Sequence, residues 1–274
     1  MLQPMFGRLA AAAPFLLFAP AALAQTTPDV VTNPDAAVSK DVQRPWLYGD
    51  DPTIPSPLHV VASLGDTYSG NDRSVSRAFS SHDTGPGGKA NATVQVGVAR
   101  TLAVDVTGVI GGFGSGVGGG VMAGARFAPF DSARHGFRLA IAAGYLLDLD
   151  RASGFYARAT ASLDVGRLRL AAMFHGEHVE RPNGDPVDLY ATFGASVRLV
   201  PAFRLGVEYV AQDLEEAFAD AEDAEGGAHQ FVGLTGSFEL LRHKLFIDFG
   251  PALAFRPEIG QVAPVGRALV SYSF

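Results

Sequence analysis

Apolar side chains recur at every second position in runs of about ten residues, and this pattern constrains the fold more than any other feature of the chain. In the clearest run, 167–177, Leu168, Leu170 and Phe174 lie on one face and Arg169 lies on the other. A helix would need apolar residues at intervals of three and four, whereas side chains of a strand alternate between two faces. The chain is therefore predicted to consist mainly of β-strands.

Twelve candidate strands follow one another along the chain. They are 58–68, 90–100, 102–112, 117–128, 136–148, 155–165, 167–178, 188–199, 203–212, 229–240, 244–254 and 265–274. Their connections are alternately short, around 100–101, 165–167, 200–202 and 241–243, and long and polar, at 69–89, 179–187, 213–228 and 255–264. Short turns at one end and long loops at the other are typical of transmembrane barrels with an even number of strands. We expect an all-β, antiparallel up-and-down transmembrane β-barrel of about 12 strands; ten or fourteen remain alternatives, and eight fit the length less well.

The N-terminal residues predict export. Arg8 supplies a positive charge, 9–20 is apolar, and Ala22 and Ala24 form a small-x-small cleavage site. A signal peptide is therefore expected over 1–24. The alternative, a membrane anchor, would need about 20 uninterrupted apolar residues, and this run is shorter and contains two prolines.

A proline-rich segment, 25–57, separates the signal peptide from the predicted barrel at 58–274. Its prolines disfavour regular helix and central strand, so we interpret it as an extended periplasmic lead-in. The alternative is a plug inside the barrel, anchored by Trp46 and Tyr48.

Composition excludes several classes of protein. No cysteine is present, so a lipoprotein anchor, disulfides and thiolate metal sites are excluded, and no cofactor is expected. The formal net charge of −7 argues against a nucleic-acid partner. After residue 24 no run of 18 apolar residues remains, which excludes membrane-spanning helices.

Alternation alone does not decide which face of a barrel meets water, because a soluble barrel turns its apolar face inward. The faces opposite the apolar rows are rich in small residues, as at Thr192, Gly194 and Ser196. The outer surface of a soluble barrel would be expected to carry Lys and Glu instead. This composition favours the membrane alternative, with the apolar rows turned to lipid.

The chain ends with hydrophobic or aromatic residues at alternate positions, Ala268, Val270, Tyr272 and Phe274. This run resembles the terminal strand of Gram-negative outer-membrane β-barrel proteins, which characteristically end in Phe. The resemblance implies a porin-like barrel in the cell outer membrane, in contact with lipid and lipopolysaccharide. It also implies recognition of the last strand by the barrel assembly machinery. We expect a monomer.

If Phe274 and its alternates face lipid, the other register lines the lumen. The candidate lumen residues are charged, and all but Glu208 lie near short turns: Asp105, Arg126, Arg138, Asp164, Arg169, Arg198, Arg204, Glu208, Glu239 and Asp248. Their signs balance, which argues against a dedicated anion channel. They are predicted to form a belt at the periplasmic mouth, either a constriction that selects solutes or a network of ion pairs that closes a structural barrel.

The sequence contains only weak indications of a catalytic site. A barrel hydrolase commonly carries His and Ser two apart on one strand face, and no His-x-Ser occurs. His175 and Glu177 share a face near the predicted outer rim, whereas His178 points away. A general base or a metal pair is conceivable there, and a histidine hydrogen-bonded to its neighbouring carboxylate is the favoured interpretation.

Two further segments suggest binding sites only superficially. The loop 213–228 is strongly acidic and could bind divalent cations at the lipopolysaccharide surface, but it lacks calcium-loop spacing and is interpreted as a solvated loop. The glycine-rich 111–120 lacks the Lys-Ser/Thr of a phosphate loop and is interpreted as a flexible hairpin connection.

The sequence is compatible with three functions. The leading hypothesis is a small passive pore for hydrophilic solutes with a charged periplasmic constriction. The second is a closed structural or surface-interaction barrel that acts through its extracellular loops. The third is an outer-membrane lipid-modifying enzyme. No catalytic, cofactor or metal residue is assigned.

Overall fold

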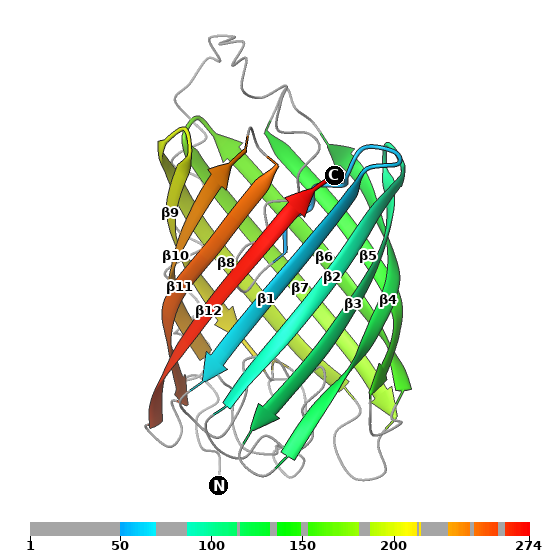
Figure 1. The fold of residues 1–274 in the computed structure, drawn as a ribbon, viewed down its shortest axis with the longest axis vertical. Coiled ribbons are helices and arrows are strands. Elements are labelled where there is room, and N and C mark those ends of the chain that lie inside the picture. Colours follow the sequence, from blue (N-terminus) through cyan, green and yellow to red (C-terminus); the bar gives the residue numbers. More distant parts are fainter. Residues whose placement is uncertain are drawn as a thin grey trace, which may run out of the picture. The chain divides into compact units, whose positions relative to one another are not determined.

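The chain forms a closed antiparallel β-barrel in which each strand pairs with its neighbours in sequence and β1 pairs with β12 (Figure 1). This is a computed structural model. It describes residues 50–69, 87–113, 116–131, 136–148, 153–180, 187–212, 214, 230–241, 244–256 and 261–274. Within these ranges there is no helix long and apolar enough to span a bilayer.

The barrel wall consists of twelve strands. They are β1 (Val60–Ser69), β2 (Gly87–Ala99), β3 (Leu102–Phe113), β4 (Gly116–Asp131), β5 (Phe137–Asp148), β6 (Ser153–Val165), β7 (Leu168–Glu180), β8 (Val187–Val200), β9 (Phe203–Ala211), β10 (Gln230–Leu240), β11 (Leu245–Arg256) and β12 (Gln261–Ser273). The number and order of strands predicted from the alternation are confirmed, as is the all-β class.

The ends of the strands differ from the prediction mainly on the side of the longer loops. There β7 and β11 continue beyond the predicted ends, and β12 begins four residues earlier than predicted, at Gln261. The connections expected at 179–187 and 255–264 are therefore shorter, at 181–186 and 257–260. Backbone pairing continues into these segments, which are only partly polar and contain Val179, Phe255 and Val262.

The glycine-rich 111–120, interpreted from the sequence as a flexible hairpin connection, belongs mostly to two strands. β3 continues to Phe113 and β4 begins at Gly116, so only 114–115 lie outside the two strands. Glycine serves close approach here, because a Cβ on Gly119, whose φ is +159°, would lie within 3.0 Å of the backbone oxygen of Val109.

The two faces of the wall differ as expected of a barrel in lipid. Large apolar side chains are exposed on the outer face of every strand, for example Ile141, Phe193 and Leu234. Polar and charged side chains are buried on the inner face, including Gln95, Asp105, Arg126, Thr160, Arg169, Glu208, Thr235, Asp248 and Ser271. A water-soluble barrel shows the reverse distribution, so the soluble alternative does not fit.

In the last strand, Phe274 and its alternates lie on the outer face, as the sequence predicted. Phe274 and Val270 are exposed, and Ser271 and Ser273 between them are buried on the inner face. The Phe274 amide donates to the Val60 carbonyl, and its ring packs edge-on against Tyr272, with centroids 4.8 Å apart. β12 and β1 therefore close the barrel at the position of Phe274.

Residues before β1 turn back into the barrel. The amide of His59 donates to the carbonyl of Ser56, and Leu58 takes a left-handed conformation with φ of 69°. This tight turn reverses the chain between β1 and residues 50–55, which we call the strap. The strap is the described end of the segment interpreted as a periplasmic lead-in, and its residues are buried or half-buried inside the barrel.

Several predictions concern segments outside the described residues. They are the signal peptide at 1–24, the rest of the lead-in at 25–49 with Trp46 and Tyr48, and nearly all of the acidic loop 213–228.

Candidate functional site

The strap is bound to the inner wall through two consecutive carboxylates. Asp50 receives hydrogen bonds from Arg126 of β4, through Nη1 to Oδ1 at 3.3 Å and through Nη2 to Oδ2. Arg158 of β6 donates from Nη1 to the same Oδ2 at 2.6 Å. Arg126 also donates to the backbone oxygen of Asp51 at 2.7 Å. Two guanidinium groups from different strands therefore bind one carboxylate, and Arg126 does so in the forked, two-bond geometry that arginine favours.

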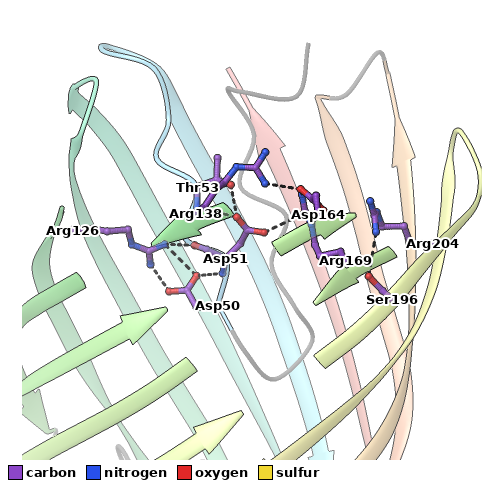
Figure 2. A network of polar contacts seen from close by, with 9 residues as sticks. All are labelled: Asp50, Asp51, Thr53, Arg126, Arg138, Asp164, Arg169, Ser196 and Arg204. Atoms are coloured by element: carbon purple, nitrogen blue, oxygen red, sulfur yellow. Dashed lines mark hydrogen bonds and ion pairs between the residues drawn. The ribbon is translucent and has the colours of Figure 1, made fainter. Parts of the chain in front are cut away.

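The second carboxylate, Asp51, pairs with a third arginine. Nη1 of Arg169 in β7 lies 3.0 Å from Oδ2 of Asp51, and neither side chain reaches solvent, with exposed fractions of 4% and 0%. Thr53 donates from its amide and its hydroxyl to the other oxygen of Asp51. Figure 2 shows Asp50 and Asp51 between Arg126 and Arg169 inside the barrel. Both oxygens of Asp51 thus have partners, which compensates for its burial.

Arg169 also belongs to a network of ion pairs near the end of the barrel where the short turns lie. Arg169 donates from Nε and Nη2 to the two oxygens of Asp164, both at 2.7 Å. Arg138 of β5 donates to Asp164 Oδ2 at 2.8 Å. β5, β6 and β7 place these three side chains on the inner face, and their cross-strand positions bring them together.

The end of the strap next to β1 packs against small residues of the wall. Ile54 packs against Ala103, Ala128 and Ala140, small residues on the inner face of β3, β4 and β5. A Cβ on Gly97 of β2 would lie within 3.0 Å of the backbone oxygens of Pro55 and Ser56. Small wall residues therefore leave the space that the strap fills.

The negative charge of Asp50 persists across ordinary pH. Burial by itself would raise the pKa of Asp50, but the neighbouring charges and hydrogen bonds of Arg126 and Arg158 outweigh it and lower the pKa to about 2. Asp50 is thus ionised wherever the barrel is expected to work.

His175 lies beside the strap site and not at the rim. Arg158 Nε donates to His175 Nδ1 at 3.1 Å, so Nδ1 is an acceptor, and Nε2 lies 2.6 Å from Glu177 Oε1. The imidazole is stacked between Tyr156 and Tyr190, with centroids 5.7 and 4.6 Å away. The expected histidine–carboxylate hydrogen bond is present, and His178 is exposed on the opposite face.

This environment does not suit catalysis or metal binding at His175. Its side chain is fully buried, and both ring nitrogens already have partners. No group of three or more potential metal-ligating side chains is found in the described part of the chain. The ring acts instead as a support that orients Arg158 toward the strap.

All ten predicted lumen residues lie on the inner face, buried or half-buried. The structure brings Arg126, Arg138, Asp164 and Arg169 together around the strap, on β4 to β7. Arg204 is elsewhere on the wall, where Nη1 donates to Ser196 Oγ at 3.3 Å (Figure 2). The remaining members, Asp105, Arg198, Glu208, Glu239 and Asp248, are distributed over β3 and β8 to β11.

Three residues central to the site were not among the predicted site residues: Asp50, Asp51 and Arg158. Arg158 belongs to the inner register but lies near the middle of β6, away from the short turns on which the prediction depended. The available signal for the other two was an acidic pair at the end of a segment otherwise rich in proline.

No protein-family model matches the chain, and no curated protein sequence matches it. Among solved structures, the COG4313 outer membrane channel from Pseudomonas putida F1 is similar, with 8% identity, a TM-score of 0.57, and coverage of 80% of this chain and 96% of that one. The KdgM porin in complex with disordered oligogalacturonate is similar at 10% identity and a TM-score of 0.51, over 77% of this chain and 99% of that one.

At such low identity these likenesses concern the fold alone. The fold is that of a porin-like outer-membrane β-barrel with twelve strands, the class to which the terminal strand pointed. In this chain the strap is held by arginines of β4, β6 and β7.

Proposed function

We propose that this protein lies in the outer membrane of a Gram-negative bacterium and acts as a passive pore for small hydrophilic solutes. The apolar outer face supports the membrane location, since an exposed apolar surface around a whole barrel would not be stable in water. The polar inner face supports the passage of hydrophilic solutes, because it offers hydrogen bonds along the wall.

The observation that carries the pore proposal is the strap itself. Barrels of about eight strands are filled by their own side chains, and wider ones leave space. Here the lumen accommodates six further residues, 50–55, beside the wall side chains. A lumen wide enough for an extended peptide is wide enough for a small solute once the peptide leaves. In the strapped state, the charged belt narrows the path on the β4–β7 side and acts as the constriction.

A closed structural barrel is the second candidate, and the burial of the belt favours it. Arg126 and Arg169 are each only 4% exposed, as expected of ion pairs that seal a wall. In that case function would depend on the extracellular loops. Deletion of 213–228 would then abolish the cellular phenotype and leave folding intact.

A lipid-modifying enzyme has less support. A catalytic base must reach its substrate, and the one cluster that suggested such a base, at His175, is sealed inside the barrel. His175→Ala is expected to leave any lipid-modifying activity of the preparation unchanged.

Planar bilayer recordings test the pore. The wild-type barrel is compared with a variant lacking 25–55, and heat-modifiable gel migration shows that both are folded. We expect discrete channels from both, with a higher open probability in the deletion variant. Two folded proteins that never open channels would overturn the pore proposal and favour the structural one.

A further inference from the structure

We propose that Arg126, Arg158 and Arg169 form a binding site for polycarboxylate solutes, and that Asp50 and Asp51 of the strap are its built-in competitor. The inference rests on the proposed pore and names the class of solute that the pore would favour. In this structure the strap carboxylates occupy the positions that solute carboxylates would take.

The site is specific for carboxylates that lie close together. Three guanidinium groups from β4, β6 and β7 bind two adjacent carboxylates, and every one of these contacts is a hydrogen bond with charge on both sides. Arginine donors match the planar, two-oxygen geometry of a carboxylate better than that of a halide ion. A solute with two or more carboxylates can therefore engage the same donors.

The wall around the strap is locally basic although the belt as a whole is balanced. On β4 to β7 the inward arginines of the network are Arg126, Arg138, Arg158 and Arg169, and Asp164 pairs with two of them. Two further buried carboxylates lie nearby: Asp105 of β3 interacts electrostatically with Arg126 and Arg158, and Glu177 of β7 bonds to His175. The arginines therefore exceed the wall carboxylates by one. Arg126 makes all of its hydrogen bonds with described residues to the strap. The strap therefore supplies the carboxylate to which Arg126 is hydrogen-bonded.

This dependence couples opening of the lumen to solute binding. A buried arginine left without a carboxylate is costly, so departure of the strap alone is unfavourable. A solute carboxylate that replaces Asp50 or Asp51 removes that cost. Arg169 lies near the short-turn end and Arg158 near the middle of its strand, so the replaced contacts lead from the mouth toward the centre of the barrel.

The experiment uses Asp50→Asn/Asp51→Asn, which removes both strap charges with little change in size. Citrate is the polycarboxylate probe, acetate the monocarboxylate, and sucrose the neutral control. Binding to the folded barrel in detergent is measured by calorimetry, and block of chloride current is measured in bilayers. We expect the double variant to bind citrate about 10-fold more tightly than wild type, with acetate much weaker and sucrose undetected.

Two wall variants locate the site. Arg126→Gln/Arg158→Gln, made in the double-variant background, is expected to lose the gained citrate binding and the anion selectivity measured by reversal potential. Arg204→Gln in the same background is the matched control, because Arg204 also faces inward but bonds to Ser196. It is expected to retain both.

The outcomes separate this inference from the pore proposal. Citrate binding that is unchanged in the double variant, or lost equally in both wall variants, overturns the carboxylate site even where channels are recorded. Citrate binding that requires Arg126 and Arg158 in a barrel that never conducts supports the site and contradicts the pore.

Discussion

Arg158 and Asp50 are separated by 108 residues in sequence, and yet Nη1 of the arginine lies 2.6 Å from Oδ2 of the aspartate inside the barrel. The same guanidinium donates from Nε to His175, which is itself held between two tyrosine rings. Arg158 is thus oriented by the wall and presented to the strap. The contacts of Arg158 with His175, and of His175 with the two tyrosine rings, involve wall residues alone, so they can form without the strap.

Substitution of Gly97 should displace the strap without unfolding the barrel. In Gly97→Ala the new methyl group would overlap the backbone oxygens of Pro55 and Ser56, which cannot move as freely as a side chain. We expect a higher open probability in bilayers and faster proteolytic cleavage within 50–57. Gly108→Ala is the control, since a Cβ there meets nothing within 4 Å, and it should behave as wild type. Equal behaviour of the two variants would contradict a close approach at Gly97.

The contribution of Asp50 to strap binding should depend on pH only in strong acid. The pKa of Asp50 in the strapped state is about 2, below the ordinary aspartate value of 3.8, so binding is fully favoured above pH 3.8 and is lost as the pH falls through about 2. The open probability should stay constant between about pH 8 and pH 5 and rise in more acid solution. Asp50→Asn should already show the raised open probability at neutral pH. A wild-type transition near neutral pH that persists in Asp50→Asn would assign the switch to another group.

A charge on the outer face should be costly according to its depth. Leu234 is exposed at the middle of β10, and Leu240 is exposed at its last residue. Leu234→Arg is expected to lower the free energy of unfolding from bilayers by about 2–4 kcal/mol, and Leu240→Arg by about 0–1 kcal/mol. Denaturant titrations of vesicle-folded protein measure both. Similar small costs at both sites would contradict the assignment of this face to lipid.

Replacement of the last residue should impair assembly more than stability. Phe274 is 66% exposed, so Phe274→Ala removes few contacts within the barrel, and its backbone hydrogen bond to Val60 is kept. If the assembly machinery recognises this residue, the variant should accumulate less in cellular outer membranes. Its spontaneous folding into vesicles should match wild type. A comparable loss in both measurements would indicate a structural role for Phe274 instead.

The strands were predictable because each one carries its own pattern. The alternation around Leu168 and Leu170 reflects a wall one residue thick, with lipid on one side and a polar lumen on the other. Strand ends were less predictable, as at Gln261, because the prolines and glycine within 257–264 indicate a loop, whereas backbone pairing of β12 begins inside this segment. The glycine-rich 111–120 was interpreted as a connection because glycines pair through their backbone and leave no side-chain pattern.

The strap site was only half predictable. Arg126, Arg138, Asp164 and Arg169 were assigned to the inner face because the register of each strand follows from Phe274. Their partners Asp50 and Asp51 lie in a proline-rich segment without periodicity. Nothing local in that segment indicates that it turns at Ser56 and enters the lumen.

The sequence by itself determined the barrel, its strand number and its inside and outside, because these depend on periodicities of ten residues or fewer. Only the tertiary structure decided what the lumen contains. Pairing of the strands brings Arg126, Arg158 and Arg169 from three strands to one place, although they are separated in the sequence. At this place their guanidinium groups form ion pairs with Asp50 and Asp51.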